Sequence, residues 1–165
     1  MLNLFKVNGK FDLKKLIVSL LISLGTGVLS AFLSMGTMKM YGRLQKPFFA
    51  PPSWIFGPVW TVLFILMGIA SYRIWMYGTQ NEAVRDALFF YGSQLVFNFM
   101  WTILFFRLEL RGLAFLDIII LLVLIAITAY KFYKLDKAAG YLMLPYLLWV
   151  AFASSLNYSL WQLNK

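Results

Sequence analysis

The sequence predicts an all-α integral membrane protein built as a bundle of five transmembrane helices. Two observations carry this prediction. Of the 165 residues, 62% are hydrophobic and 13% are charged, whereas soluble domains average about one-half and one-quarter. The chain also holds five mostly apolar stretches, each close to the ~20 residues that a helix needs to cross ~30 Å of hydrocarbon.

The predicted helices follow the apolar stretches in chain order, and charged residues near the ends set their limits. The stretches cover residues 16–38, 53–72, 87–106, 112–130 and 138–164, and the last is long enough to span with a tilt. With their flanks included, we expect helices over about 13–38, 53–77, 87–107, 112–134 and 138–163. Apart from loop one, residues 39–52, the connections are short, which predicts a single membrane domain over residues 1–165. On the first helix, small residues at steps of four, Ser23, Gly27 and Ala31, favour close packing.

The charges exclude several functions and suggest an orientation. The formal net charge is +9, but the cations lie in short clusters between apolar stretches, as is typical of residues that flank membrane spans. We therefore expect no nucleic-acid partner. Nine cations fall on the N-terminal side and six on the other, which predicts a cytoplasmic N-terminus in the cell membrane.

The sequence contains no histidine and no cysteine. Disulfides, triads with a histidine base and metal sites held by imidazole or thiolate are therefore excluded, and we expect no metal and no cofactor.

Loop one is rich in proline. Pro47, Pro51 and Pro52 fix the backbone and withhold hydrogen-bond donors, so the segment is stiff. Long ordered loops often carry binding roles. We interpret loop one as a lid over the mouth of the bundle that controls ligand release, with a simple connector as the alternative.

A layer of aromatic and amide side chains is predicted at one depth in the bundle. The third and fifth predicted helices each place polar and aromatic or small residues on one face, and the fourth carries a single acid within its span. The residues are Gln94, Asn98, Trp101 and Phe105 on the third helix, Asp117 on the fourth, and Trp149, Ala153 and Asn157 on the fifth, with Trp60 from the second. An amide in hydrocarbon needs a partner or a cavity, so the faces should turn inward. The layer is either a small-molecule pocket open toward loop one or a polar network that locks the helices. Asp117 is either a functional carboxylate that faces the interior of the bundle or a structural partner of a neighbouring arginine or amide.

Three motifs make the chain resemble the TspO family of translocator and tryptophan-rich sensory proteins. They are GRLQKPFFAPPSWIFGPVWTVLFILMG, SQLVFNFMWTILFF and LPYLLWVAFASSLNYSLWQLN, with an acid in the fourth helix between the last two. The resemblance implies a five-helix membrane protein, usually a homodimer, with a cavity under loop one that binds tetrapyrroles and other flat apolar ligands. The family pocket is matched here by Trp60, Phe64, Asn98, Trp101, Trp149 and Ala153, and Asn157 and Asp117 match family positions as well.

The sequence departs from the family pattern at several positions. Loop one reads Lys46, Pro47, Phe48, Phe49 where the family often has Lys-Pro-x-Trp, and no arginine follows Tyr158 closely enough to support the sterol pattern of animal members. The leading functional hypothesis is a receptor or carrier for porphyrin as ligand, with a sensory or transport role and with lipid as its surroundings. The alternatives are light- and oxygen-dependent porphyrin degradation, with Trp60 and Trp149 as electron donors, and a structural or regulatory membrane partner without a ligand.

Overall fold

The structure, a computed structural model, describes residues 4–35 and 38–165, and within them it confirms the all-helical fold. The elements are α1 (Leu13–Leu33), α2 (Met38–Arg43), the 3₁₀ turn η1 (Ser53–Ile55), α3 (Phe56–Trp75), α4 (Glu82–Thr102), the π-helical turn η2 (Ile103–Arg107), α5 (Arg111–Leu135) and α6 (Lys137–Leu163). In the described part of the chain, five helices are long and apolar enough to cross a membrane. The protein is therefore an integral, multi-pass membrane protein.

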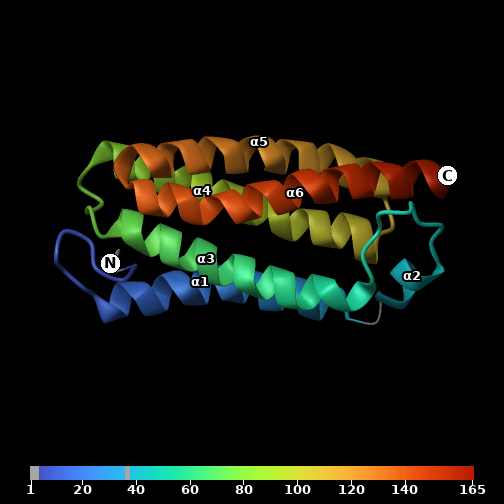
Figure 1. The fold of residues 1–165 in the computed structure, drawn as a ribbon, viewed down its shortest axis with the longest axis horizontal. Helices are drawn as coiled ribbons and strands as arrows, with labels where there is room; N and C mark the ends of the chain where they lie inside the picture. Colours follow the sequence, from blue (N-terminus) through green and yellow to red (C-terminus); the bar gives the residue numbers. More distant parts are fainter. Residues whose placement is uncertain (1–3, 36–37) are drawn as a thin grey trace.

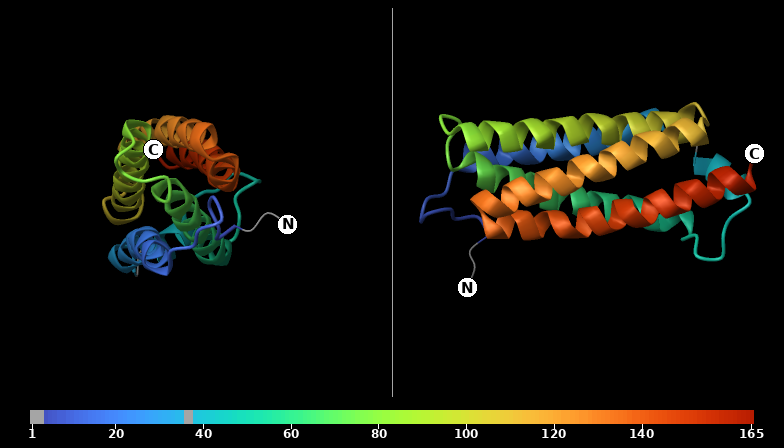
Figure 2. Two further views of the ribbon diagram at one scale, coloured as in Figure 1. Left: turned by 90° about the vertical axis from the view of Figure 1, so that its left-hand side faces the viewer. Right: turned by 90° about the horizontal axis from the view of Figure 1, so that it is seen from above.

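The five long helices form an up-and-down bundle (Figure 1). Around the bundle, α1 packs along α3, α3 along α6, α6 along α5 and α5 along α4, while α4 meets α1 and α3 over a shorter length (Figure 2). The first described residues lie at one end. The other end, which we call the loop-one end, carries α2, residues 44–52 and the C-terminus. Each long helix thus runs antiparallel to the next one in the chain.

The helix limits follow the prediction closely at most ends, and caps explain the differences. The first helix ends at Leu33 instead of residue 38, and residues 36 and 37 of the predicted helix lie outside the described residues. The short helix α2 starts at Met38 and covers the first part of the predicted loop one. The third span starts at Glu82, five residues earlier than predicted, because Asn81 Oδ1 accepts a hydrogen bond from the N–H of Ala83 (3.0 Å) and caps the helix. In α3, Pro58 is the third residue, where its missing N–H costs no helical bond.

The turn between α5 and α6 brings two backbones very close together. Gly140 lies against Tyr133, and a Cβ added at Gly140 would come within 2.6 Å of Tyr133 Cα and 2.8 Å of its nitrogen. These neighbours are backbone atoms, so they cannot rotate away. Only glycine allows α5 and α6 to approach this closely here.

We expect Gly140→Ala to lower the free energy of unfolding by about 1–3 kcal/mol, because the added methyl group overpacks a rigid contact. Chemical unfolding in detergent measures the effect. Gly92→Ala is the matched control, since nothing lies within 4 Å of a Cβ there and alanine is the better helix former by about 1 kcal/mol. Equal behaviour of the two variants would contradict the close approach.

An ion pair is buried at the end of the bundle opposite loop one. Arg73 donates from Nε to Asp136 Oδ1 (3.1 Å) and from Nη2 to Asp136 Oδ2 (2.8 Å), and the two side chains are 7% and 5% exposed. Arg73 Nη1 also donates to the carbonyl of Leu4 (2.8 Å), and the N–H of Ala139 donates to Asp136 Oδ1 (2.9 Å). The pair therefore fastens the N-terminal segment, α3 and the start of α6 together.

The lowered pKa of Asp136 makes the stability of the folded protein depend on pH. Burial alone would raise the pKa of this carboxyl, but the hydrogen bonds from Arg73 and from the backbone of Ala139 outweigh burial and hold it below its ordinary value. A lowered folded-state pKa means that the stabilisation is complete above the unfolded-state pKa of about 3.9 and is lost as the pH falls through the folded-state pKa. We expect thermal stability in detergent to fall more steeply below about pH 4 in the wild type than in Asp136→Asn. Parallel pH profiles would contradict this assignment.

Candidate functional site

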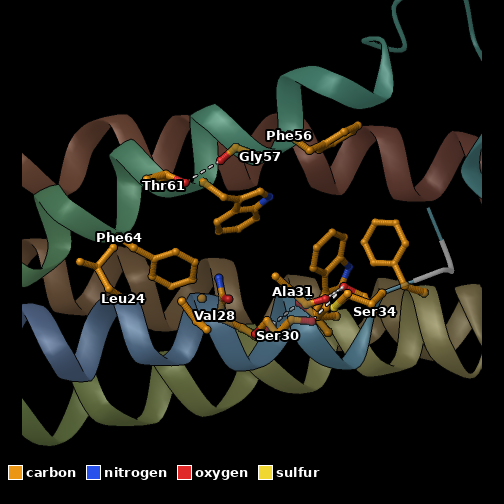
Figure 3. A pocket seen from close by; sticks show the side chains of 16 residues that line it. Leu24, Val28, Ser30, Ala31, Ser34, Phe56, Gly57, Thr61 and Phe64 are labelled. Atoms are coloured by element: carbon orange, nitrogen blue, oxygen red, sulfur yellow. Dashed lines mark hydrogen bonds between the residues drawn. The ribbon is translucent and has the colours of Figure 1, made fainter.

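A cavity of about 540 Å³ lies between α1, α3 and α4 (Figure 3). Its volume falls within the range of small-molecule sites, about 300–1,000 Å³. The described residues that line it are Leu24, Gly27, Val28, Ser30, Ala31, Ser34, Met35, Phe56, Gly57, Trp60, Thr61, Phe64, Asn98, Trp101, Thr102 and Phe106. None of these carries a charge, so the wall is apolar and aromatic with a few hydroxyl and amide groups.

Trp60 is the centre of the aromatic lining. Its ring centroid lies 5.7 Å from Phe64 and 6.3 Å from Trp101, with interplanar angles of 31° and 35°. Trp101 in turn stacks on Phe105 at 5.4 Å. Rings at these distances and angles present broad, roughly aligned apolar faces. Such a surface suits a flat ligand, which gains from offset stacking as well as from burial.

Contacts between α1 and α3 close the cavity at the end that is farther from loop one. Ser23 Oγ donates to the backbone carbonyl of Phe64 (2.6 Å), which ties α1 to α3. One turn further, the Phe64 ring lies on Gly27, where an added Cβ would come within 2.6 Å of two ring carbons. In the sequence, the small residues of α1 indicate close packing only, so the place of Gly27 and Ala31 in the cavity wall was missed.

The amides predicted to turn inward are buried and form two hydrogen-bonded groups. Tyr146 OH donates to Gln94 Oε1 (2.7 Å) and accepts from Asn98 Nδ2 (2.9 Å). In the second group, Trp101 Nε1 donates to Asn157 Oδ1 (2.9 Å), and Asn157 Nδ2 donates to the carbonyl of Arg111 (3.0 Å). Asn98 and Trp101 thus belong both to the cavity wall and to the polar network.

The predicted site residues are not all brought together. Trp60, Phe64, Asn98 and Trp101 line the cavity. Ala153 and Asn157 instead border a nearly filled gap of about 10 Å³ beside Trp101.

The other two predicted residues lie outside the cavity lining. Trp149 packs on Phe56 and Phe152, and its Nε1 has no hydrogen-bond partner among the described residues. Trp60 lines the cavity and Trp149 does not, so the two tryptophans of the degradation hypothesis do not share one cavity. Asp117 is buried on α5, and its Oδ2 has no hydrogen-bond partner in the described part of the chain.

Loop one is fixed to the neighbouring helix α6. Gln45 and Asn164 exchange two hydrogen bonds of 2.9 Å, and Tyr41 OH donates to the carbonyl of Pro51 (2.9 Å). Residues 39–52, including Pro47, Pro51 and Pro52, contribute none of the described lining residues. The role of these prolines as a lid stays a prediction.

Comparisons with known proteins agree with the motifs. A model of the TspO/MBR family matches residues 17–162. The chain is 40% identical to "Tryptophan-rich protein TspO" of Archaeoglobus fulgidus, over 93% of this chain and 99% of that protein. It is 41% identical to the bovine "Translocator protein" (89% and 88%) and 38% identical to "Tryptophan-rich sensory protein" of Cereibacter sphaeroides (75% and 76%). The chain belongs to the TspO/MBR family.

Proposed function

We propose that this protein is a membrane receptor or carrier that binds a flat apolar ligand of the tetrapyrrole class in the cavity between α1, α3 and α4. The observation that carries the proposal is the set of rings around that space, Trp60, Phe64 and Trp101. The translocator and sensory proteins among the relatives fit a membrane receptor. The homodimer, the cell-membrane location and the cytoplasmic N-terminus stay predictions.

The energetics support a ligand held mainly by apolar contact. Each aromatic contact contributes about 0.5–1.5 kcal/mol beyond the burial of area, and burial itself contributes about 25 cal/mol per Å². A micromolar complex requires about 8 kcal/mol. Three rings together with the aliphatic wall of α1 supply contacts on that scale without any charged group.

Titration with protoporphyrin, read by quenching of tryptophan fluorescence in detergent, tests the proposal. We expect saturable binding in the micromolar range. Trp60→Leu should raise the Kd about tenfold, because the loss of one central ring contact costs about 1.4 kcal/mol. Trp54→Leu is the matched control, since Trp54 is 72% exposed and lies outside the cavity lining.

Two outcomes would contradict the proposal. One is the absence of saturable binding at micromolar porphyrin in a correctly folded sample. The other is an equal change in Kd for Trp60→Leu and Trp54→Leu, which would place the ligand elsewhere on the protein.

A further inference from the structure

The cavity opens through the side of the bundle. Several residues that line it are also largely exposed, so the cavity is not sealed on this side; among them are Val28 (66% exposed) on α1 and Thr61 and Gly57 on α3. Figure 3 shows α1 and α3 on either side of the cavity, with Val28 and Ala31 on one and Thr61 on the other. Because both helices are membrane spans, outward-facing side chains on them face lipid. We call this opening, bordered by Val28, Ala31, Gly57 and Thr61, the side mouth.

The depth of the side mouth follows from both helices independently. Val28 lies five residues before the end of α1 at Leu33, and Thr61 lies five residues after the start of α3 at Phe56. At 1.5 Å per residue each is ~8 Å inside its helix end. Since the hydrocarbon core is ~30 Å thick, the part of the side mouth between Val28 and Thr61 opens into the apolar part of the membrane, while Ala31 and Gly57 lie nearer the helix ends.

The contacts between α1 and α3 explain why the opening ends where it does. The two helices touch at Ser23 and Phe64 and again at Leu20 and Gly68, where an added Cβ would come within 3.1 Å of the Leu20 backbone. Toward the loop-one end, the cavity occupies the space between them. The contact between α1 and α3 therefore limits the side mouth on the side farther from the loop-one end.

Loop one lies against a different part of the bundle. Its two hydrogen bonds to Asn164 and the contact of Phe49 with Phe152 (6.2 Å between ring centroids) hold it on α6, whereas the side mouth lies between α1 and α3. The cavity wall also offers no charged side chain among the described lining residues. A ligand that arrives through lipid and binds in this cavity therefore meets no charged side chain among these lining residues.

We propose that the ligand enters sideways from the bilayer, between α1 and α3, and that the cavity takes largely apolar molecules dissolved in the membrane. The proposal rests on the proposed function for the identity of the site, but the route itself concerns any small apolar molecule. Loop one then affects the rate of exchange less than the residues of the side mouth do.

The absence of native cysteine allows a direct test of the route without porphyrin. Thr102 lines the cavity and is buried, so Thr102→Cys places a single thiol inside it. The protein is reconstituted in liposomes and treated with pyrene maleimide, which dissolves in lipid, or with a charged trimethylammonium methanethiosulfonate in water. Each rate is divided by the rate of the same reagent with the unfolded protein. We expect the normalised rate of the lipid-soluble reagent to be at least tenfold higher.

Blocking the side mouth separates the two routes. Adding Thr61→Trp to Thr102→Cys should slow labelling by the lipid-soluble reagent at least tenfold, and Val28→Trp provides a second block from α1. Val62→Trp is the matched control, because Val62 is exposed beside Thr61 but does not line the cavity; its rate should stay within twofold. Replacing Pro51 and Pro52 with Gly-Ser should also leave the rate unchanged. Size-exclusion chromatography and circular dichroism confirm that each variant is folded.

Several results would overturn the proposal. They are an unchanged rate in both folded block variants, an equal normalised rate for the charged reagent, a large acceleration by the loop-one variant alone, or no labelling of the folded protein by either reagent. Porphyrin affinity, measured in the same liposomes, is read separately. A wild type that binds no porphyrin contradicts the proposed function, while the labelling rates still decide the route.

Discussion

Replacing Arg73 with methionine is expected to lower the free energy of unfolding by about 3–5 kcal/mol, because it leaves the carboxylate of Asp136 buried without its partner. Both side chains are almost fully buried, and Arg73 also holds the backbone carbonyl of Leu4 (2.8 Å). The guanidinium makes two hydrogen bonds to one carboxylate, a geometry that lysine does not reproduce. The loss should therefore loosen the N-terminal segment as well.

Chemical unfolding in detergent measures this effect, and hydrogen exchange at residues 4–12 reports the loosening. The matched control is Lys131→Met, which removes the partner of Asp86 from a pair whose side chains are 31% and 47% exposed. An exposed pair contributes at most about 1 kcal/mol. In addition, the double variant Arg73→Met with Asp136→Leu should recover part of the loss, since no charge is then stranded. Equal losses in Arg73→Met and Lys131→Met would refute a buried pair.

Tyr146→Phe is expected to lower the free energy of unfolding by at least about 2 kcal/mol. Tyr146 OH is bonded to both Gln94 and Asn98, and all three side chains are at most 2% exposed. Removing one hydroxyl therefore leaves an amide oxygen and an amide N–H buried without these partners. Each unsatisfied group costs about 1–3 kcal/mol.

The same unfolding assay measures the Tyr146 effect. Tyr158→Phe is the control, because Tyr158 is 48% exposed and surface changes of this kind usually stay within about 0.5 kcal/mol. A Tyr146→Phe protein as stable as the control would show that the network adds no stability.

Asn98 combines the two readings that the sequence leaves open, the small-molecule pocket and the locking network. It lines the cavity and also donates to Tyr146. Trp101 likewise has its ring in the cavity wall and its Nε1 bonded to Asn157. One set of side chains therefore shapes the space and joins α4 to α6. The structural alternative without a ligand is supported if substitutions at Asn98 change stability while porphyrin does not bind.

The membrane class, the number of spans and most of their limits could be predicted from the amino-acid sequence alone. These properties depend on local quantities: the run of apolar residues, the charges at its ends and the caps. Helical periodicity also placed Gln94, Asn98 and Trp101 on one inward face, and all three are buried. The end of α1 at Leu33, the short helix α2 and the early start at Glu82 were missed because single capping interactions and tertiary contacts decide helix ends.

The set of helices that encloses the cavity could not be predicted without the three-dimensional fold. Periodicity says which face of a helix turns inward, but not which neighbour that face meets. Because α1 lies beside α3 and close to α4, the cavity wall includes Gly27 and Val28, while Trp149 and Asp117 pack elsewhere. The order of helices around the bundle depends on contacts between residues far apart in the chain, such as Ser23 with Phe64 and Trp101 with Asn157. Such contacts leave no periodic signal in one sequence.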